Sequence, residues 1–145
     1  MMTPLERAQK SAQAMWDNDS ASQRVGMKLV EVGVGSAVLS MIIDDQHLNG
    51  HKICHGGYIF MLADSAFAFA CNSYNQLAVA YQNSITYSAP GKKGDVLTAK
   101  AVEVSKSGRS GIYDVTITNQ NDEALAHFRG HSRTIKGTHF TENEA

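Results

Sequence analysis

The apolar and polar residues of this chain follow two spacings, one typical of helices and one typical of strands. Residues 3–16 begin with Thr3 at a helix N-cap, Pro4 in the first turn and Glu6 completing a capping box, and their apolar side chains then recur on one face. A short second helix is predicted at about residues 20–25. Runs rich in β-branched residues predict strands at residues 27–34, 36–43, 77–88, 95–105, 111–118 and 123–135.

The most informative segment is a long helix predicted between Gly57 and Cys71. Its residues are apolar around almost the whole circumference, whereas a helix at the surface of a protein keeps a polar face. Such a helix has to be enclosed by the rest of the fold or by a partner subunit, and one antiparallel sheet curled around it would satisfy this requirement. The order helix, two strands, long helix, four strands indicates an α+β protein with an antiparallel sheet.

Asp64 is the only charged residue between His55 and Lys92. Burying an isolated carboxylate is costly, and proteins retain one where it is paired or functional. Desolvation at this position would raise the pKa of Asp64 toward the range useful for base catalysis. The alternative is that Asp64 points into solvent or caps a backbone group.

Two consecutive glycines, Gly56 and Gly57, follow His55 at the expected start of this helix. Glycines leave backbone N–H groups approachable, and a helix N-terminus carries positive potential, so this turn could hold an anion or a developing oxyanion. The alternative is that the glycines only permit close packing of the helix against the sheet.

Composition and charge limit the kinds of partner. The 145 residues are 43% apolar and 19% charged, with a net charge of −1. This balance is typical of one globular domain, expected to span residues 1–145 with a loose polar tail at about 137–145. It provides no overall positive field for binding nucleic acid or an anionic membrane.

The expected location of the protein is the cytoplasm. The N-terminal residues lack the apolar core of a signal peptide, and the longest apolar run, residues 58–71, is shorter than the ~20 residues that cross a bilayer. Cys54 and Cys71 have no metal-type spacing and are expected to be reduced in that compartment.

Three stretches of the chain resemble the hotdog-fold thioesterases, and among them the PaaI-type branch associated with phenylacetate degradation. They read LNGHKICHGGYIFMLADSAFAFACNS, NSITYSAPGKKGDVLTAKA and FRGHSRTIKG. The resemblance covers about residues 14–138. It implies a long helix wrapped by a curved antiparallel sheet, subunits that pair edge to edge, dimers that often stack into tetramers, and an active site at the dimer interface.

The resemblance also implies roles for individual residues. Asp64 would act as nucleophile or general base, and Asn49 would position the water or the carboxylate. The backbone N–H of Gly56, with Gly57 as its neighbour and His55 before it, would polarise the thioester carbonyl. The implied reaction is hydrolysis of an aryl-acetyl or related short acyl-coenzyme A to a free acid and coenzyme A, with no metal or organic cofactor.

Substrate contacts are expected outside this core. Some members of the family carry a hydroxyl on the strand after the helix, at the position where this chain has Ala80. Tyr81 and Ser84 are close to this position in the sequence. In the last strand, basic residues alternate onto one face, and this face could meet the phosphates of coenzyme A or simply be solvated. The residues predicted to bind substrate are Tyr81, Ser84, Lys106, Arg109 and Arg133.

Other kinds of chemistry are disfavoured. Cys54 beside His55 suggests a thiol nucleophile, but neighbours in sequence rarely present both side chains to one substrate. His47, His51 and His55 recur every four residues, but nearby glycines argue against a metal-binding helix. The hydratase branch of the family has a histidine where this chain has Phe69. A non-catalytic acyl-CoA-binding module would have no need of a buried carboxylate beside a bare helix terminus.

Overall fold

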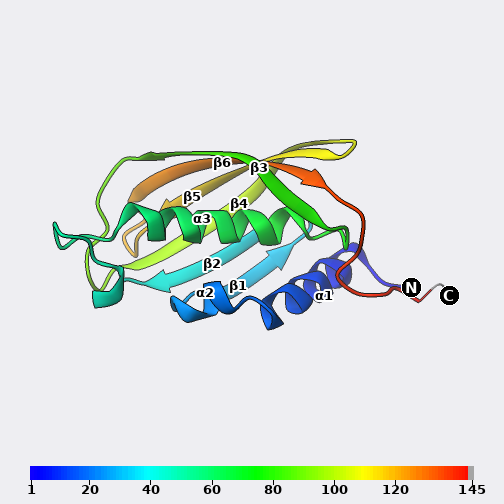
Figure 1. Ribbon diagram of the computed structural model, residues 1–145, viewed down its shortest axis with the longest axis horizontal. Helices are drawn as coiled ribbons and strands as arrows, with labels where there is room; N and C mark the ends of the chain where they lie inside the picture. Colours follow the sequence, from blue (N-terminus) through cyan, green and yellow to red (C-terminus); the bar gives the residue numbers. More distant parts are fainter. Residues whose placement is uncertain (144–145) are drawn as a thin grey trace.

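One six-stranded sheet curves around one long helix, and two further helices lie below them in the view of Figure 1. The computed structural model describes residues 1–143. The elements are α1 (Pro4–Asp17), α2 (Ser20–Arg24), β1 (Lys28–Gly33), β2 (Ser36–Ile42), a 3-10 helix η1 (Asp45–His47), α3 (Gly56–Cys71), β3 (Ala78–Tyr87), β4 (Val96–Ser107), β5 (Ser110–Thr118) and β6 (Ala124–Thr134). The predicted antiparallel sheet around a central helix is confirmed.

Helix α1 begins as its sequence predicts. Thr3 Oγ1 accepts from the Glu6 amide at 3.1 Å, and the Thr3 amide donates to the Glu6 carboxylate at 3.2 Å, so both halves of the capping box are present. On the inner face of α1, Ala8 and Ala12 are buried in the main core. The helix thereby packs against β1, the first strand of the sheet.

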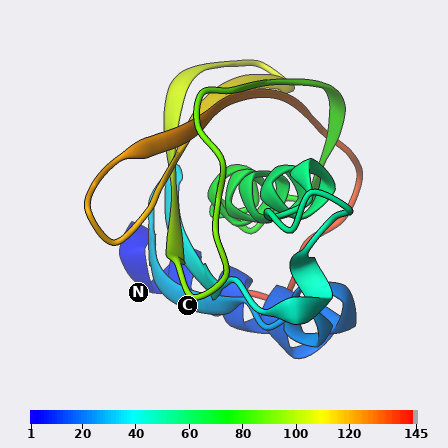
Figure 2. The same cartoon turned by 90° about the vertical axis from the view of Figure 1, so that its left-hand side faces the viewer.

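Helix α3 lies within the curve of the sheet, as the end-on view in Figure 2 shows. Its most buried side chains include Ala63, Ala66 and Ala70, whose methyl groups allow the helix axis to approach β2, β4 and β5 closely. Phe67 packs under β6, where a Cβ on Gly130 would lie 2.8 Å from the Phe67 ring. Among residues 1–143, no helix is long and apolar enough to span a bilayer.

The strand order across the sheet is β1-β2-β4-β5-β6-β3, and every neighbouring pair is antiparallel. Strand β3 therefore crosses over the molecule after α3 and pairs with the last strand, β6, which places β1 and β3 at the two edges. A bulge at Tyr81 shifts the register of β3, because Ala80 pairs with Ser132 and Gln82 pairs with His131.

The C-terminal residues pack across the end of α3. The His139 ring nitrogen Nε2 lies 2.8 Å from Asn72 Oδ1, and the Glu142 carboxylate pairs with Arg7 of α1 at 2.7 Å and accepts from Asn75 Nδ2 at 3.1 Å. The predicted tail thus makes side-chain hydrogen bonds to the rest of the chain as far as Glu142, and its looseness stays a prediction. Residues 144–145 of the predicted tail lie outside the described residues.

Candidate active site

Asp64 lies in the middle of α3, on the side of the helix that faces β3. Asn83 of β3 donates its side-chain amide Nδ2 to Asp64 Oδ1 at 3.0 Å. The Asp64 carboxyl group is half-buried, and burial raises its pKa above the usual value, while the hydrogen bond from Asn83 partly opposes the increase. The side chain is therefore a partly desolvated carboxylate with one protein donor, which favours base chemistry.

The start of α3 leaves one of its two glycine amides free. The His55 ring nitrogen Nδ1 accepts a hydrogen bond from the Gly57 amide at 2.8 Å, so His55 is the N-cap of the helix. Within residues 1–143 the Gly56 amide has no acceptor, whereas the Gly56 carbonyl accepts from the Tyr87 hydroxyl at 2.8 Å. Of the two predicted oxyanion donors, Gly56 is therefore available and Gly57 is occupied.

Asn49 stabilises the loop that leads into α3. Its side-chain Oδ1 accepts from the amides of His51 and Ile53, at 3.0 and 3.3 Å. These bonds form a tight turn of the kind that asparagine favours, and they fix the segment that ends at His55. The Asn49 amide nitrogen Nδ2 has no acceptor among the described residues. The hydrogen bonds of the Asn49 side chain do not include Asp64 of the same chain.

The bare amide and the carboxylate of one chain lie far apart. Asp64 follows Gly56 by eight residues of α3, and at ~1.5 Å per residue their backbones are separated by about 12 Å along the helix axis. A nucleophile and the carbonyl carbon that it attacks have to come within ~3–3.5 Å. The separation along the helix is therefore several times the distance between two reacting atoms.

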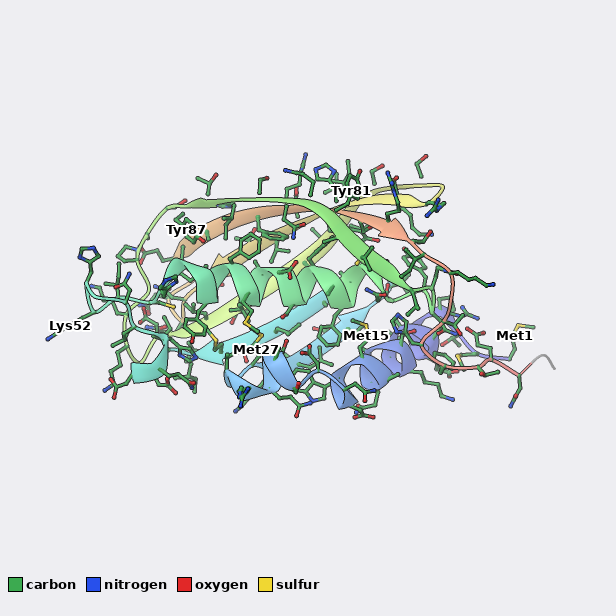
Figure 3. All side chains as sticks on the ribbon, viewed as in Figure 1. Met1, Met15, Met27, Lys52, Tyr81 and Tyr87 are labelled. Atoms are coloured by element: carbon green, nitrogen blue, oxygen red, sulfur yellow. The ribbon has the colours of Figure 1, made fainter. Side chains whose placement is uncertain are left out.

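Two of the predicted substrate contacts lie on the other face of β3. Ser84 pairs with Arg129, whereas Asn83 pairs with Gly130, and strand residues alternate between the two faces of a sheet. Tyr81, at the bulge, lies at the outside of the molecule (Figure 3). The Arg133 guanidinium stacks over its ring, with the guanidinium carbon 4.9 Å from the ring centroid. Neither side chain can supply the hydroxyl that Ala80 lacks on the inner face.

The predicted basic residues gather at one end of the sheet. Lys106 and Arg109 belong to the β4–β5 hairpin, and Ser110 of this hairpin pairs with Arg133. The Lys106 ammonium lies 4.2 Å from the centre of the Tyr74 ring, and Arg109 donates to the Thr134 carbonyl at 3.0 and 3.2 Å. This end of the sheet is near Cys71, at the opposite end of α3 from Gly56.

Cys54, Cys71 and His47 have roles outside this site. Burial raises the pKa of Cys54 to about 11 and that of Cys71 to about 12, so both thiols are protonated at neutral pH and poor nucleophiles. His47 is buried, with its Nδ1 accepting from the Asp44 amide and its Nε2 2.8 Å from the Val25 carbonyl, so both ring nitrogens are engaged in packing the loop onto α2.

One residue near Asp64, Asn83, was missed by the sequence reasoning. Asn83 is a polar residue at an inward position of β3, between Ala80 and Ile85, and this break in the apolar series was the available signal. Phe60 precedes Asp64 by one helical turn and therefore shares its face of α3. The ring of Phe60 is half-buried and packs edge-on against Phe128, with centroids 5.5 Å apart.

Comparison with known proteins gives consistent matches. A family model described as the thioesterase superfamily matches residues 51–126. The chain is 43% identical to the acyl-coenzyme A thioesterase PaaI of Escherichia coli over 132 residues, which cover 91% of this chain and 94% of the relative.

Solved structures agree with these sequence matches. The E. coli PaaI structure, from the phenylacetic acid degradation operon, superposes with a TM-score of 0.92 at 42% identity and covers 94% of this chain and 99% of its own. A Streptococcus mutans protein solved with acetyl-CoA superposes with a TM-score of 0.74 at 30% identity, over 78% of this chain and 90% of the other.

Proposed function

The chain belongs to the thioesterase superfamily, and we propose that it hydrolyses a small acyl-CoA to a free acid and coenzyme A. The family predicted from the sequence motifs, its hotdog fold and its enzyme class, thioester hydrolase, are confirmed by the similarity to PaaI. The roles of individual residues, the acyl group and the assembly are the parts that we propose, with residues 1–145 acting as one hotdog domain.

The observation that carries the proposal is the environment of Asp64. A thioester carbonyl needs a nucleophile at its carbon and a donor at its oxygen. Asp64 is a half-buried carboxylate with a raised pKa, suited to attack the carbonyl or to deprotonate a water. Gly56 offers a free amide at the positive end of a 16-residue helix, suited to hold the oxygen of the tetrahedral intermediate.

The ~12 Å between Asp64 and Gly56 along α3 supports a site to which two chains contribute. We therefore place Asp64 of one protomer opposite the Gly56 amide of its partner. The free edge of β3 supports this assembly: it is ten residues long and has β6 as a neighbour on one side only. The dimer is the proposed active unit, and stacking of two dimers into a tetramer would leave this pairing unchanged.

The loop before α3 has a supporting role in this site. Asn49 fixes the turn that presents His55, and its free side-chain amide Nδ2 could reach the substrate or the attacking water in the partner's site. His55 caps the helix and thereby orients the Gly56 amide. Each of these residues acts at the helix start, at the end of α3 that the partner's Asp64 is proposed to face.

The basic cluster of Lys106, Arg109 and Arg133 is proposed to meet the phosphates of coenzyme A. All three side chains are exposed, and Arg109 and Arg133 have planar guanidinium groups that suit phosphate oxygens. Tyr81 and Ser84 lie on the same outer face as Arg133, so we assign them to the nucleotide part of the substrate and not to the reacting carbonyl.

The acyl group is proposed to be aryl-acetyl or similarly small. Of the phenylalanines of α3 that could contact an aryl group, Phe67 and Phe69 are 1% exposed and belong to the core. Phe60 remains half-buried on the same face as Asp64, where its ring can stack against an aryl group in an edge-to-face arrangement. The relative PaaI belongs to a phenylacetic acid degradation operon, which supports this choice.

Two free, buried cysteines fit a reducing compartment, so the cytoplasm is the proposed location. A hydratase is disfavoured because Phe69, at the position of the hydratase histidine, packs in the core against Trp16. A non-catalytic acyl-CoA carrier is disfavoured because such a protein has no use for a desolvated carboxylate.

The decisive experiment is thiol release from phenylacetyl-CoA, acetyl-CoA and palmitoyl-CoA by the wild type and by Asp64→Asn. The amide can neither attack nor remove a proton, so kcat should fall by ~10²–10⁴ on the preferred substrate. Far-ultraviolet circular dichroism and sedimentation should show an unchanged fold and assembly.

Asp114→Asn is the matched control, because Asp114 lies on the outer face of β5 in an ion pair with Arg129. This variant should retain wild-type turnover. Equal rates for the wild type and Asp64→Asn would refute the catalytic assignment.

A further inference from the structure

The side-chain oxygen of Asn83 has no hydrogen-bond donor. Asn83 Oδ1 is buried, and no group within residues 1–143 donates to it. Buried polar atoms in native proteins are almost always paired, so an orphan next to a catalytic carboxylate calls for a specific explanation.

The orientation of the Asn83 amide is fixed by Asp64. An ionised carboxylate only accepts hydrogen bonds, so the amide nitrogen Nδ2 has to face it, as it does at 3.0 Å. Flipping the amide would set two acceptors against each other. The oxygen therefore points away from the Asp64 Oδ1 contact, and a donor has to reach it from a third position close to both side chains.

We propose that Asn83 is a catalytic residue whose Oδ1 accepts one hydrogen of the attacking water while Asp64 accepts the other. A water molecule has two hydrogens to donate, and this pair of side chains offers two acceptors held in one rigid unit by the Asn83–Asp64 hydrogen bond. The inference rests on the proposed function and deepens it, since it assigns Asp64 as a general base and not as the atom that attacks.

The reaction then balances as follows. Asp64 removes one proton from the water, and the water oxygen forms a bond to the thioester carbon, whose oxygen becomes negative against the partner's Gly56 amide. The C–S bond then breaks, and the coenzyme A thiolate takes the proton from Asp64. The products are the acid and free coenzyme A, and Asp64 returns to its ionised form.

Asn83 also explains how the site functions with Ala80 in place of a hydroxyl. Both residues lie on the inner face of β3, where Ala80 has only a methyl group and the neighbouring polar side chains, Tyr81 and Ser84, point outward. Asn83 is the polar side chain of β3 that contacts Asp64. It supplies the water-holding oxygen that the strand would otherwise lack.

The test compares Asn83→Leu, Asn83→Ala and the control Gln82→Ala with wild type on the preferred acyl-CoA. Gln82 is the adjacent amide side chain, but it pairs with His131 and points to the outer face. Loss of the water-holding oxygen should lower kcat by about 10- to 100-fold and change KM by less than about 2-fold. Gln82→Ala should match the wild type.

The pH profile gives a readout that a purely structural role would not change. The hydrogen bond from Asn83 lowers the pKa of Asp64, so its removal should shift the acidic limb of kcat/KM to higher pH. Cys71 is the titratable group that interacts electrostatically with Asp64, and its thiol, with a pKa of about 12, stays neutral over this range. An unshifted acidic limb in both Asn83 variants would count against the inference.

Isotope labelling detects direct attack by Asp64 when water cleaves the resulting acyl–Asp64 anhydride at the aspartyl carbon. Repeated turnover in H₂¹⁸O should place the label in the released acid and none in the peptide that contains Asp64. Label in the Asp64 carboxylate would show direct attack and overturn the inference while leaving the hydrolase assignment intact.

A donor from the partner subunit is the competing explanation for the orphan oxygen. It predicts that Asn83→Leu and Asn83→Ala weaken the dimer in sedimentation and leave the per-dimer kcat unchanged, which would also overturn the inference. Failure of the proposed function has a different signature, because wild type and Asp64→Asn would then release thiol equally.

Discussion

The two edges of the sheet differ in how they are protected. Strand β1 has six residues with two charged side chains, Lys28 and Glu31, and helix α1 packs against it. Strand β3 has ten residues, AVAYQNSITY, none of them charged. Val79, Tyr81 and Tyr87 of this strand are each about half exposed, at 46%, 54% and 48%.

Edge strands of monomeric proteins are usually protected by charge, proline or a covering element, because an exposed edge invites pairing with another chain. The β1 edge has such protection, and the β3 edge has only the bulge at Tyr81. The difference supports the proposed pairing of β3 with the same strand of a partner chain. Asp64 and Asn83 lie beside this edge, so the proposed pairing would bring each site its second half.

The largest effect is expected from removing the Gly56 amide. Gly56→Pro eliminates the N–H without disturbing the helix, because proline suits the first helical position and His55, with φ −60° and ψ 131°, has the conformation that precedes proline. We expect kcat to fall by ~10²–10³. In Gly56→Ala the N–H remains and the added Cβ lies equally close to the Tyr87 ring, at 3.1 Å, so this variant controls for steric effects.

Mixing subunits extends this test to the comparison of edges. Gly56→Pro and Asp64→Asn chains, refolded together, should recover about a quarter of wild-type activity, because half of the dimers are mixed and each mixed dimer has one intact site of two. If both groups acted within one chain, the mixture would stay as inactive as its parents.

A somewhat smaller effect is expected from charging the β3 edge. Gln82→Lys with Thr86→Lys places like charges on two β3 strands that meet across a two-fold axis, which should destabilise their pairing. In sedimentation the dimer should dissociate at higher protein concentration than wild type, and specific activity should fall by 10-fold or more on dilution.

The matched change on the other edge is Val30→Lys, at a side chain of β1 that is 59% exposed. It should leave both assembly and activity unchanged, since surface substitutions typically alter stability by less than about 0.5 kcal/mol. An equal loss of assembly from both variants would show that β3 has no special role.

The smallest effect concerns stability beside the β3 edge. The pKa of Asp64 is raised in the folded protein, so its ionised form costs stability as the pH rises through that value, and the cost vanishes at low pH. Asp64→Asn should therefore resist urea better than wild type at pH 8, with the difference shrinking toward pH ~4.

Asp114→Asn should show the opposite sign in the same urea experiment. The ion pair with Arg129 holds the pKa of Asp114 below its usual value, so this carboxylate contributes stability at neutral pH that is lost as the pH falls through that lowered value. A wild type more resistant than Asp64→Asn at pH 8 would contradict the raised pKa.

The fold was largely predictable from local signals. The capping box of Thr3 and Glu6 and the all-apolar character of α3 each express an interaction between residues close in sequence. The strand order was not predictable, because pairing of β3 with β6 depends on contacts between distant segments that no local pattern encodes. The contacts of the tail were not predictable for the same reason: its polar residues bind Asn72, Asn75 and Arg7, far away in the chain.

The site was predictable only in part. Asp64 was identifiable because a lone carboxylate contradicts its apolar surroundings, and Gly56 because of its place at a helix start. Because these two groups are separated along α3, the sequence alone does not tell which chain supplies each of them to one substrate. The outward direction of Tyr81 depends on the bulge in β3, and the contact of Asn83 with Asp64 depends on the crossover after α3.

The alanines on the buried face of α3 determine how closely the helix, and with it Asp64, approaches the sheet. Since Ala63 and Ala66, on either side of Asp64, have no surface exposed, their methyl groups set how far the helix sinks toward the sheet. A single added carbon at either position would push α3 away from the sheet and displace the Asp64 carboxylate. Selection on turnover would therefore be felt at residues that never meet the substrate.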